Sequence, residues 1–214
     1  MILALDTSLG SGVAVVGLDG VELAEAASDN PLGHAEVIGD LIRRSLAEAS
    51  VSPEQITHVA AGMGPGPFTG LRIGVAAARA FALARSARLV PVVSHDAAAR
   101  THFDAADADA PVAIVTDARR REFAYTVYAG LDPRGVPVRA TEPTLAPRDE
   151  LDDRLREAGA RRIDASRISA AALGRVAAHR IAAGDAGAED GMTEPLYLRT
   201  PDVTLGAVPK RVGT

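Results

Sequence analysis

Cysteine is absent from this chain of 214 residues, and aromatic residues make up only 3% of it. Without cysteine, the sequence excludes disulfide bonds, zinc–thiolate sites and cysteine nucleophiles. Since 47% of the residues are hydrophobic, the core must be built from alanine, valine and leucine. The length allows one large domain or two small lobes, each with its own core.

The sequence also shows neither a leader pattern nor a long apolar run. Residues 1–6 reach the acid Asp6 without a basic n-region, which does not match a signal peptide. No uninterrupted apolar stretch approaches membrane-spanning length. We therefore expect a soluble, cytoplasmic protein without membrane contact. The net charge of -5 argues against a broad nucleic-acid surface and leaves a local RNA contact open.

A segment rich in glycine and proline, residues 62–74, is the most informative part of the chain. Its sequence is GMGPGPFTGLRIG, and an apolar helical stretch begins within it. Because glycine permits backbone angles closed to other residues and proline fixes φ, the loop is rigid and shaped. Two interpretations remain open: a tight turn with close backbone packing, or an anion cradle at a helix N-terminus. An ATP-hydrolysing loop does not fit, because no Walker lysine follows Gly66 and Thr69 stands where a dinucleotide fingerprint needs glycine.

Hydrophobic periodicity predicts an α/β order for the first half of the chain. Strands are expected over 2–6, 13–16, 21–27, 56–61 and 89–93, the first three as an antiparallel meander. Helices are expected over 34–49, 71–84 and 96–103, the last capped by Ser94. The helix over 71–84 is apolar almost all round, so several of its faces must be covered. We expect its own sheet to cover one face and a second chain to cover another.

The second half repeats this order in outline. Strands are expected over 112–116 and 123–127, around a charged turn at 117–121, and helices over 147–158 and 169–183. A strand, an acid-bearing turn and a second strand occur in each half, at Asp6 and at Asp117, which indicates a weak internal duplication and two related lobes. We place the first lobe at residues 1–104 and a smaller one at 105–200, joined by an Ala/Asp linker at 104–110. Residues 201–214 form a tail with little to bury.

Three segments together resemble the TsaB (YeaZ-type) proteins: MILALDTS at 1–8, the glycine-rich loop at 62–74 and EPLYLR at 194–199. His34 ahead of its helix and VTDARRRE at 115–122 are similar to the same family. The likeness follows the family's order over most of the chain, and the loop motif is shared in looser form only with TsaD-type proteins. The resemblance implies an actin-like ATPase-domain (ribonuclease H-like) fold, with two lobes that each carry a mixed sheet flanked by helices.

The same resemblance implies a role in making N6-threonylcarbamoyladenosine at position 37 of tRNAs that read ANN codons. In that family a TsaD-type subunit transfers the threonylcarbamoyl group, a TsaE-type ATPase joins the assembly, and the TsaB-type member is a required non-catalytic partner. ATP then belongs to the partner subunits, and tRNA is met within the complex. One departure is clear. Residues 159–168 stand where family members carry a glycine-containing strand and a further segment, so we expect a reduced second lobe.

The residues themselves offer little support for catalysis by this chain. Five histidines occur, at His34, His58, His95, His102 and His179. Of these, His95 and His102 are seven apart, or about 10.5 Å along a helix, too far to share a metal. The close histidine pair of TsaD-type catalysts is absent, and no G-x-S-x-G elbow supports a protease. We predict no catalytic or metal-binding residue.

Two other functions stay open beside that of a partner subunit. Vestigial nucleotide binding is one, with Asp6, Thr7, Gly64 and Gly66 as the candidate residues, and it would fit an actin-like ATPase or a metal-dependent hydrolase. Direct tRNA contact through the basic cluster Arg119, Arg120 and Arg121 is the other, although the default interpretation of such a cluster is a solvated turn.

The favoured hypothesis is an interaction protein. The helices over 34–49 and 71–85 would share an apolar face that pairs with the equivalent helices of the TsaD-type subunit in a four-helix junction. Without that partner, the same face makes a two-fold homodimer. The residues expected at this interface are His34, Ile38, Leu41, Ile42, Arg72, Val75, Ala78, Arg79 and Leu83.

Overall fold

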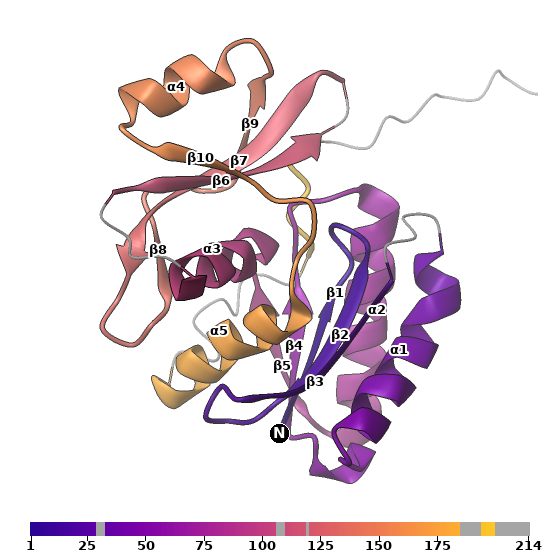
Figure 1. The fold of residues 1–214 in the computed structure, drawn as a ribbon. Coiled ribbons are helices and arrows are strands. Elements are labelled where there is room, and N and C mark those ends of the chain that lie inside the picture. The colour runs from indigo at the N-terminus through magenta and orange to yellow at the C-terminus, as the bar shows by residue number, and fades with distance from the viewer. Residues whose placement is uncertain (29–32, 106–109, 119, 185–193, 200–214) are drawn as a thin grey trace, which may run out of the picture.

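Two sheets, each flanked by helices, form the two lobes of the chain (Figure 1). The structure is a computed structural model that describes residues 1–28, 33–105, 110–118, 120–184 and 194–199. Both sheets are mixed, which confirms the predicted α/β fold class. Among the helices of these residues, none is long and apolar enough to cross a membrane.

The first sheet carries the N-terminal half of the chain. Its strands are β1 (Ile2–Asp6), β2 (Ser11–Val16), β3 (Glu22–Ser28), β4 (His58–Gly62) and β5 (Arg88–Val92), in the order β3-β2-β1-β4-β5. The first three strands pair antiparallel, as the predicted meander requires, whereas β1 with β4 and β4 with β5 are parallel. This sheet is buried on both faces, which explains why β1 reads as a continuous apolar run.

Helices cover both faces of the first sheet, and the alternation of β1 separates the two cores. On one face lie α1 (His34–Glu48) and α2 (Phe68–Arg85), packed with Leu3 and Leu5; the short η1 (Pro53–Gln55) follows α1. On the other face lies α5 (Ala170–Ala182), packed with Ile2 and Ala4. Figure 1 shows α5 on the side of the sheet opposite α1 and α2.

The second sheet repeats the central three-strand arrangement of the first. Its strands are β6 (Val112–Ala118), β7 (Glu122–Leu131), β8 (Pro137–Arg139), β9 (Thr144–Pro147) and β10 (Arg161–Asp164). The β6–β7 pair is antiparallel and β10 runs parallel to β6, just as β1 pairs antiparallel with β2 and parallel with β4. This shared topology supports the predicted duplication. On this sheet, α4 (Leu151–Glu157) covers one face and α3 (Ser94–Ala105) the other, where α3 also contacts α5.

Three sequence predictions of secondary structure need correction, two of them in the second half of the chain. Residues 161–164 form β10, so the described part of the second sheet has five strands like the first; β8, with three residues, and β9 and β10, with four each, are short, whereas β6 has seven and β7 has ten. The predicted helix over 147–158 is helical only from Leu151, because residues 144–147 pair with β7 as β9. Helix α3 begins at Ser94 itself, so Ser94 is not a cap ahead of it.

The division into lobes also differs from the prediction. The helix over 169–183 was placed in the smaller lobe, but α5 packs against the first sheet, with Leu173 and Val176 in the core beside Ile2. The chain therefore returns to the first lobe after completing the second sheet. Most of the predicted linker, residues 106–109, and the predicted tail at 201–214 lie outside the described residues.

Candidate functional site

The glycine-rich loop between β4 and α2 packs tightly against the turn that follows β1. At Gly62, an added Cβ would stand 2.0 Å from the carboxylate oxygen Oδ2 of Asp6. At Gly74, in α2, an added Cβ would stand 2.1 Å from Oγ1 of Thr7. No side chain fits at either position without displacing its neighbour. The geometry therefore supports the close-packing interpretation of the loop.

Asp6 is buried beneath this loop, and its oxygens already have hydrogen-bond donors. Oδ1 accepts from the Ser8 N–H at 2.8 Å and from the Ser8 hydroxyl at 2.5 Å, while Oδ2 accepts from the Ser94 hydroxyl at 2.5 Å. Only 2% of the residue is exposed. Burial raises the pKa of the Asp6 carboxyl above its usual range, against the opposing effect of these hydrogen bonds.

The other three candidates for nucleotide binding are Thr7, Gly64 and Gly66, and none of them offers a free polar side chain. Thr7 is buried and its hydroxyl donates to the Gly70 carbonyl at 2.7 Å. Gly64 is buried and its N–H donates to the Ser94 hydroxyl at 3.0 Å, whereas Gly66 is exposed. A magnesium-bound phosphate needs open carboxylate oxygens and outward-facing N–H groups. The arrangement around Asp6 does not fit such a group.

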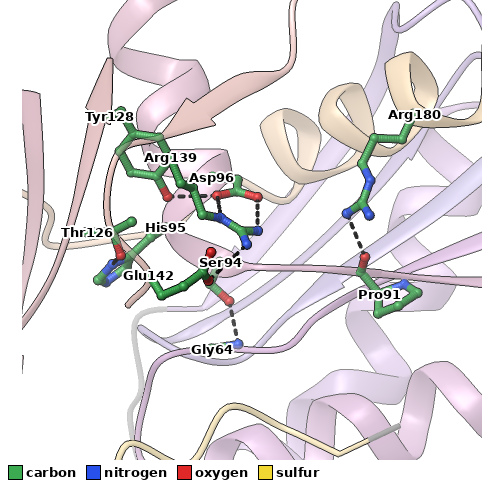
Figure 2. Close-up of polar contacts among 10 residues, drawn as sticks. All are labelled: Gly64, Pro91, Ser94, His95, Asp96, Thr126, Tyr128, Arg139, Glu142 and Arg180. Atoms are coloured by element: carbon green, nitrogen blue, oxygen red, sulfur yellow. Dashed lines mark hydrogen bonds and ion pairs between the residues drawn. The ribbon is translucent and has the colours of Figure 1, made fainter. Parts of the chain in front are cut away.

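Three consecutive residues at the start of α3 join the two lobes, and Figure 2 shows their contacts. We call Ser94, His95 and Asp96 the junction cluster. Ser94 faces the first lobe, where it bridges Asp6 and the Gly64 N–H. All three residues are buried. Because they are adjacent in sequence and face different neighbours, a small segment of backbone fixes both lobes at once.

His95 connects the cluster to the second sheet. Its Nδ1 lies 2.8 Å from the Thr126 hydroxyl and its Nε2 lies 3.0 Å from the Thr116 hydroxyl, on strands β7 and β6. Complete burial, with a smaller effect of Arg139, lowers the pKa of His95 to about 3. The imidazole is therefore neutral at physiological pH, and the ring donates to one threonine and accepts from the other.

Asp96 completes the connection through a buried ion pair. Arg139, on β8, donates from Nε to Oδ1 at 2.8 Å and from Nη2 to Oδ2 at 2.6 Å, and the Tyr128 hydroxyl donates to Oδ1 at 2.7 Å. Burial, followed by the charge of Asp96, raises the pKa of Tyr128 well above its usual value. Figure 2 shows Tyr128 and Arg139 converging on Asp96. Such a fork of two parallel bonds fixes orientation as well as distance.

Ser94, His95 and Asp96 are buried, and their hydrogen bonds hold the two lobes together. Sequence reasoning missed the roles of His95, Asp96, Tyr128 and Arg139, and it assigned Ser94 to helix capping. A signal was present in the chain: three polar residues directly follow an apolar strand, at 94–96. Thr126 and Tyr128 also stand two apart on one strand and so share a face.

Five of the nine residues predicted at a partner interface point inward. His34, Ile38, Leu41, Val75 and Ala78 are all buried within the chain itself. The His34 ring lies 2.8 Å from the Ser11 hydroxyl and packs close to Gly70, and the four apolar side chains join the core between the first sheet and α1–α2. Their placement on the outward face was therefore wrong, because that core encloses them.

The other four predicted interface residues lie on or near the outer face of α1 and α2. Ile42 is half-buried, and Arg72, Arg79 and Leu83 are exposed, Leu83 to 85%. Between them α2 also exposes Ala76 and Ala80, at helical spacing along the same stripe. We call this surface, made of Arg72, Ala76, Arg79, Ala80 and Leu83, the α2 stripe. The helix is thus not enclosed on all sides by its own chain.

The remaining candidates are separated from one another. His95 and His102 both lie on α3, but only His95 is buried. Nε2 of His102 lies 3.0 Å from Nη2 of Arg161. Within the parts of the chain that the structure describes, no three histidine or acidic side chains are grouped to hold a metal ion. Arg119 lies outside the described residues. Arg120 and Arg121 are exposed at the β6–β7 turn with φ of 65° and 62°, and RNA contact there stays a prediction.

Comparison with known proteins adds family and fold relationships to this geometry. A family model described as TsaD, tRNA N6-adenosine threonylcarbamoyltransferase, matches residues 25–135. Among curated proteins, uncharacterized protein ML0378 of Mycobacterium leprae is 35% identical over 133 residues, which is 60% of this chain and 35% of that protein. The chain thus spans about a third of the length of this relative.

Two solved structures have the same fold over most of the chain. One is a crystal structure titled as an uncharacterized protein with similarity to peptidase YEAZ, from Pseudomonas aeruginosa. It has a TM-score of 0.72 and 26% identity, and covers 92% of this chain and 99% of its own. The other is YeaZ from Pseudomonas aeruginosa, also with a TM-score of 0.72 and 26% identity, covering 86% of this chain and 94% of its own.

Proposed function

We propose, from the premise that the chain belongs to the TsaD family of tRNA N6-adenosine threonylcarbamoyltransferases, that it acts in N6-threonylcarbamoyladenosine modification of tRNA as a partner subunit and not as the transferase. Its likeness to YeaZ structures over nearly its whole length supports a YeaZ-type (TsaB-type) relative of TsaD. The partners in this proposal are a TsaD-type transferase and a TsaE-type ATPase, with tRNA bound by the assembly.

The observation that carries the non-catalytic part of the proposal is the closed surrounding of Asp6. An acid at the end of the first strand is where an actin-like ATPase places a magnesium-linked carboxylate. In this chain the carboxylate is buried and receives three hydrogen bonds from Ser8 and Ser94. To coordinate a cation it would have to lose these donors, and each lost partner of a buried group costs about 1–3 kcal/mol.

The α2 stripe is the surface that we propose for the TsaD-type partner. Its two alanines keep the surface low, which lets a second helix approach closely. Leu83 is the largest exposed apolar side chain on it, and removing such a side chain from water contributes about 1.5–3 kcal/mol. Arg72 and Arg79, two helical turns apart, lie along one side of the stripe and provide charged contacts there. The outer face of α1, which contacts α2, extends the surface.

The test introduces charge on the stripe without disturbing the core. Leu83→Glu and Ala80→Arg alter exposed positions, so the folded monomer should keep its stability to within about 0.5 kcal/mol. Both variants should lose co-purification with a TsaD-type subunit of the same organism. Leu131→Glu makes a similar change at a 37% exposed leucine of the second lobe and should bind as the unaltered chain does. Unchanged co-purification of both stripe variants would defeat the proposed surface.

A second copy of this chain could also bind the α2 stripe and form a homodimer. Sedimentation of the chain alone reports it, and in that case Leu83→Glu should convert a dimer into a monomer. The variants Val75→Glu and Ala78→Arg are unsuitable for this purpose, because both side chains are buried and a charge there would unfold the monomer.

A further inference from the structure

The segment that carries the EPLYLR motif runs between the two lobes and touches both. Residues 194–199 follow α5 in the chain and lie, in yellow in Figure 1, between the second sheet and the first lobe. Pro195 is buried and residues 196–199 are half-buried. We call this segment the strap. Its contacts fall into two groups, one on each lobe.

The first group fastens the strap to the glycine-rich loop and to the first turn of α2. The Leu196 N–H donates to the Met63 carbonyl at 2.8 Å. The Tyr197 ring lies 4.8 Å from the Phe68 ring between centroids, and its hydroxyl accepts from Nε of Arg72 at 3.0 Å. The Arg72 guanidinium in turn lies 3.8 Å from the Phe68 ring centroid. Tyr197 therefore holds an otherwise exposed arginine in one orientation.

The second contact fastens the strap to the other lobe. Arg199 forms an ion pair with Glu122, the first residue of β7. Two residues separate Arg199 from Leu196, and one residue separates it from Tyr197. The chain between the two attachments is therefore too short to lengthen much if the lobes move apart. Any movement that separates β7 from the first turn of α2 must break one of the two attachments.

We propose that residues 194–199 act as a releasable strap that limits movement of the second lobe relative to the glycine-rich loop and orders the first turn of α2. The junction cluster lies deep between the lobes and acts as the pivot, because Ser94, His95 and Asp96 are buried and bonded on both sides. The strap lies nearer the surface and depends on a few contacts, one of them a partly exposed ion pair. Because the strap makes few contacts and its residues 196–199 are only half-buried, it is the part that opens first.

The absence of cysteine allows a direct test by distance measurement between two introduced spin labels. Ala47→Cys places one label on an exposed position of α1, and Glu157→Cys places the other on an exposed position of α4. In the otherwise unaltered chain, we expect a narrow distribution of distances between the lobes. Arg199→Glu and Tyr197→Ala should each broaden it, and the charge-swapped pair Glu122→Arg with Arg199→Glu should narrow it again.

Hydrogen exchange on the full chain provides the second readout. Arg199→Glu should accelerate exchange about tenfold or more in peptides that cover 194–199, and also in those that cover 63–75. Arg156→Glu breaks a solvent-exposed ion pair with Asp153 on α4 and should leave both regions unchanged. Near-ultraviolet and far-ultraviolet circular dichroism establish that each variant is folded. If the distance distribution and the exchange of 63–75 are unaffected by Arg199→Glu and Tyr197→Ala, the strap is a passive surface segment and the proposal is overturned.

Discussion

Replacing Ser94 with alanine tests whether the corner beneath the glycine-rich loop is a closed polar assembly. The Ser94 hydroxyl donates to Asp6 and accepts from the Gly64 N–H, and its residue is fully buried. Ser94→Ala leaves Oδ2 of Asp6 without its donor and the Gly64 N–H without its acceptor. At about 1–3 kcal/mol for each of these two groups, the expected loss is roughly 2–6 kcal/mol of unfolding free energy. For a chain of this size, that lowers Tm by roughly 4–24 °C.

The loss should depend on pH in a direction set by Asp6. Burial raises the pKa of the folded-state carboxyl above the unfolded value. The folded chain therefore keeps its proton where the unfolded chain has lost it, so stability is greatest below the unfolded pKa and falls as pH rises through the folded pKa. Ser94→Ala removes a hydrogen bond that lowers the pKa, which extends this fall to higher pH. The destabilisation should consequently be larger at pH 8 than at pH 4.5.

Urea unfolding followed by circular dichroism at several pH values measures this effect. Ser166→Ala, at an exposed serine, is the matched control and should change stability by less than about 0.5 kcal/mol. When Asp6 is replaced by asparagine, the stability that Ser94→Ala removes should no longer depend on pH. A loss below about 1 kcal/mol, or a loss independent of pH, would show that Asp6 is not a buried, hydrogen-bonded carboxylate.

Two further predictions concern the same region. Gly74→Ala should destabilise the fold by about 1–3 kcal/mol, because the added Cβ would overlap the Thr7 hydroxyl. Gly39→Ala, where an added Cβ has no atom within 4 Å, should stabilise α1 by about 0.5–1 kcal/mol. Thermal unfolding measures the stability of both variants, and an equal change in the two would contradict the close packing at Gly74. The His95 imidazole should not titrate between pH 5 and 8 in an NMR experiment, since its pKa is lowered to about 3. In the unfolded chain, His95 takes up a proton near pH 6.5. The free energy of unfolding should therefore be highest above pH 6.5 and should decline as the pH falls towards the pKa of His95 in the folded chain. His95→Asn should weaken that decline, and an unchanged acid profile would refute the assignment.

The sequence predicts the positions of helices and strands better than it predicts which of them pack together. The helical pattern of residues 34–49 and the glycine-rich loop ahead of α2 predict both helices nearly within their observed bounds, since hydrophobic periodicity and loop composition are local properties. Strand β10 escaped prediction because RRID is short and polar, and its extended form depends on pairing with β6. The destination of α5 on the first sheet is likewise a tertiary property that its own residues do not contain.

The misplaced interface residues have a similar cause. Helix α2 is apolar almost all round, so its hydrophobic pattern does not distinguish the face that meets β1 and β4 from the face that meets solvent. Val75 and Ala78 lie on the first face, and Leu83 lies on the second. The junction cluster was missed for another reason: three polar residues after a strand are typical of a loop or cap, and only the second sheet gives His95 and Asp96 their partners.

Reconstituted threonylcarbamoyl transfer to tRNA tests the proposed function most directly. The assay combines the TsaD-type and TsaE-type subunits of the same organism, with or without this chain, and measures N6-threonylcarbamoyladenosine in the tRNA. We expect modification only when the chain is present, none from the chain alone, and no restoration by the Leu83→Glu variant. Modification that proceeds equally without the chain, or that the chain performs by itself, would contradict its role as a non-catalytic partner.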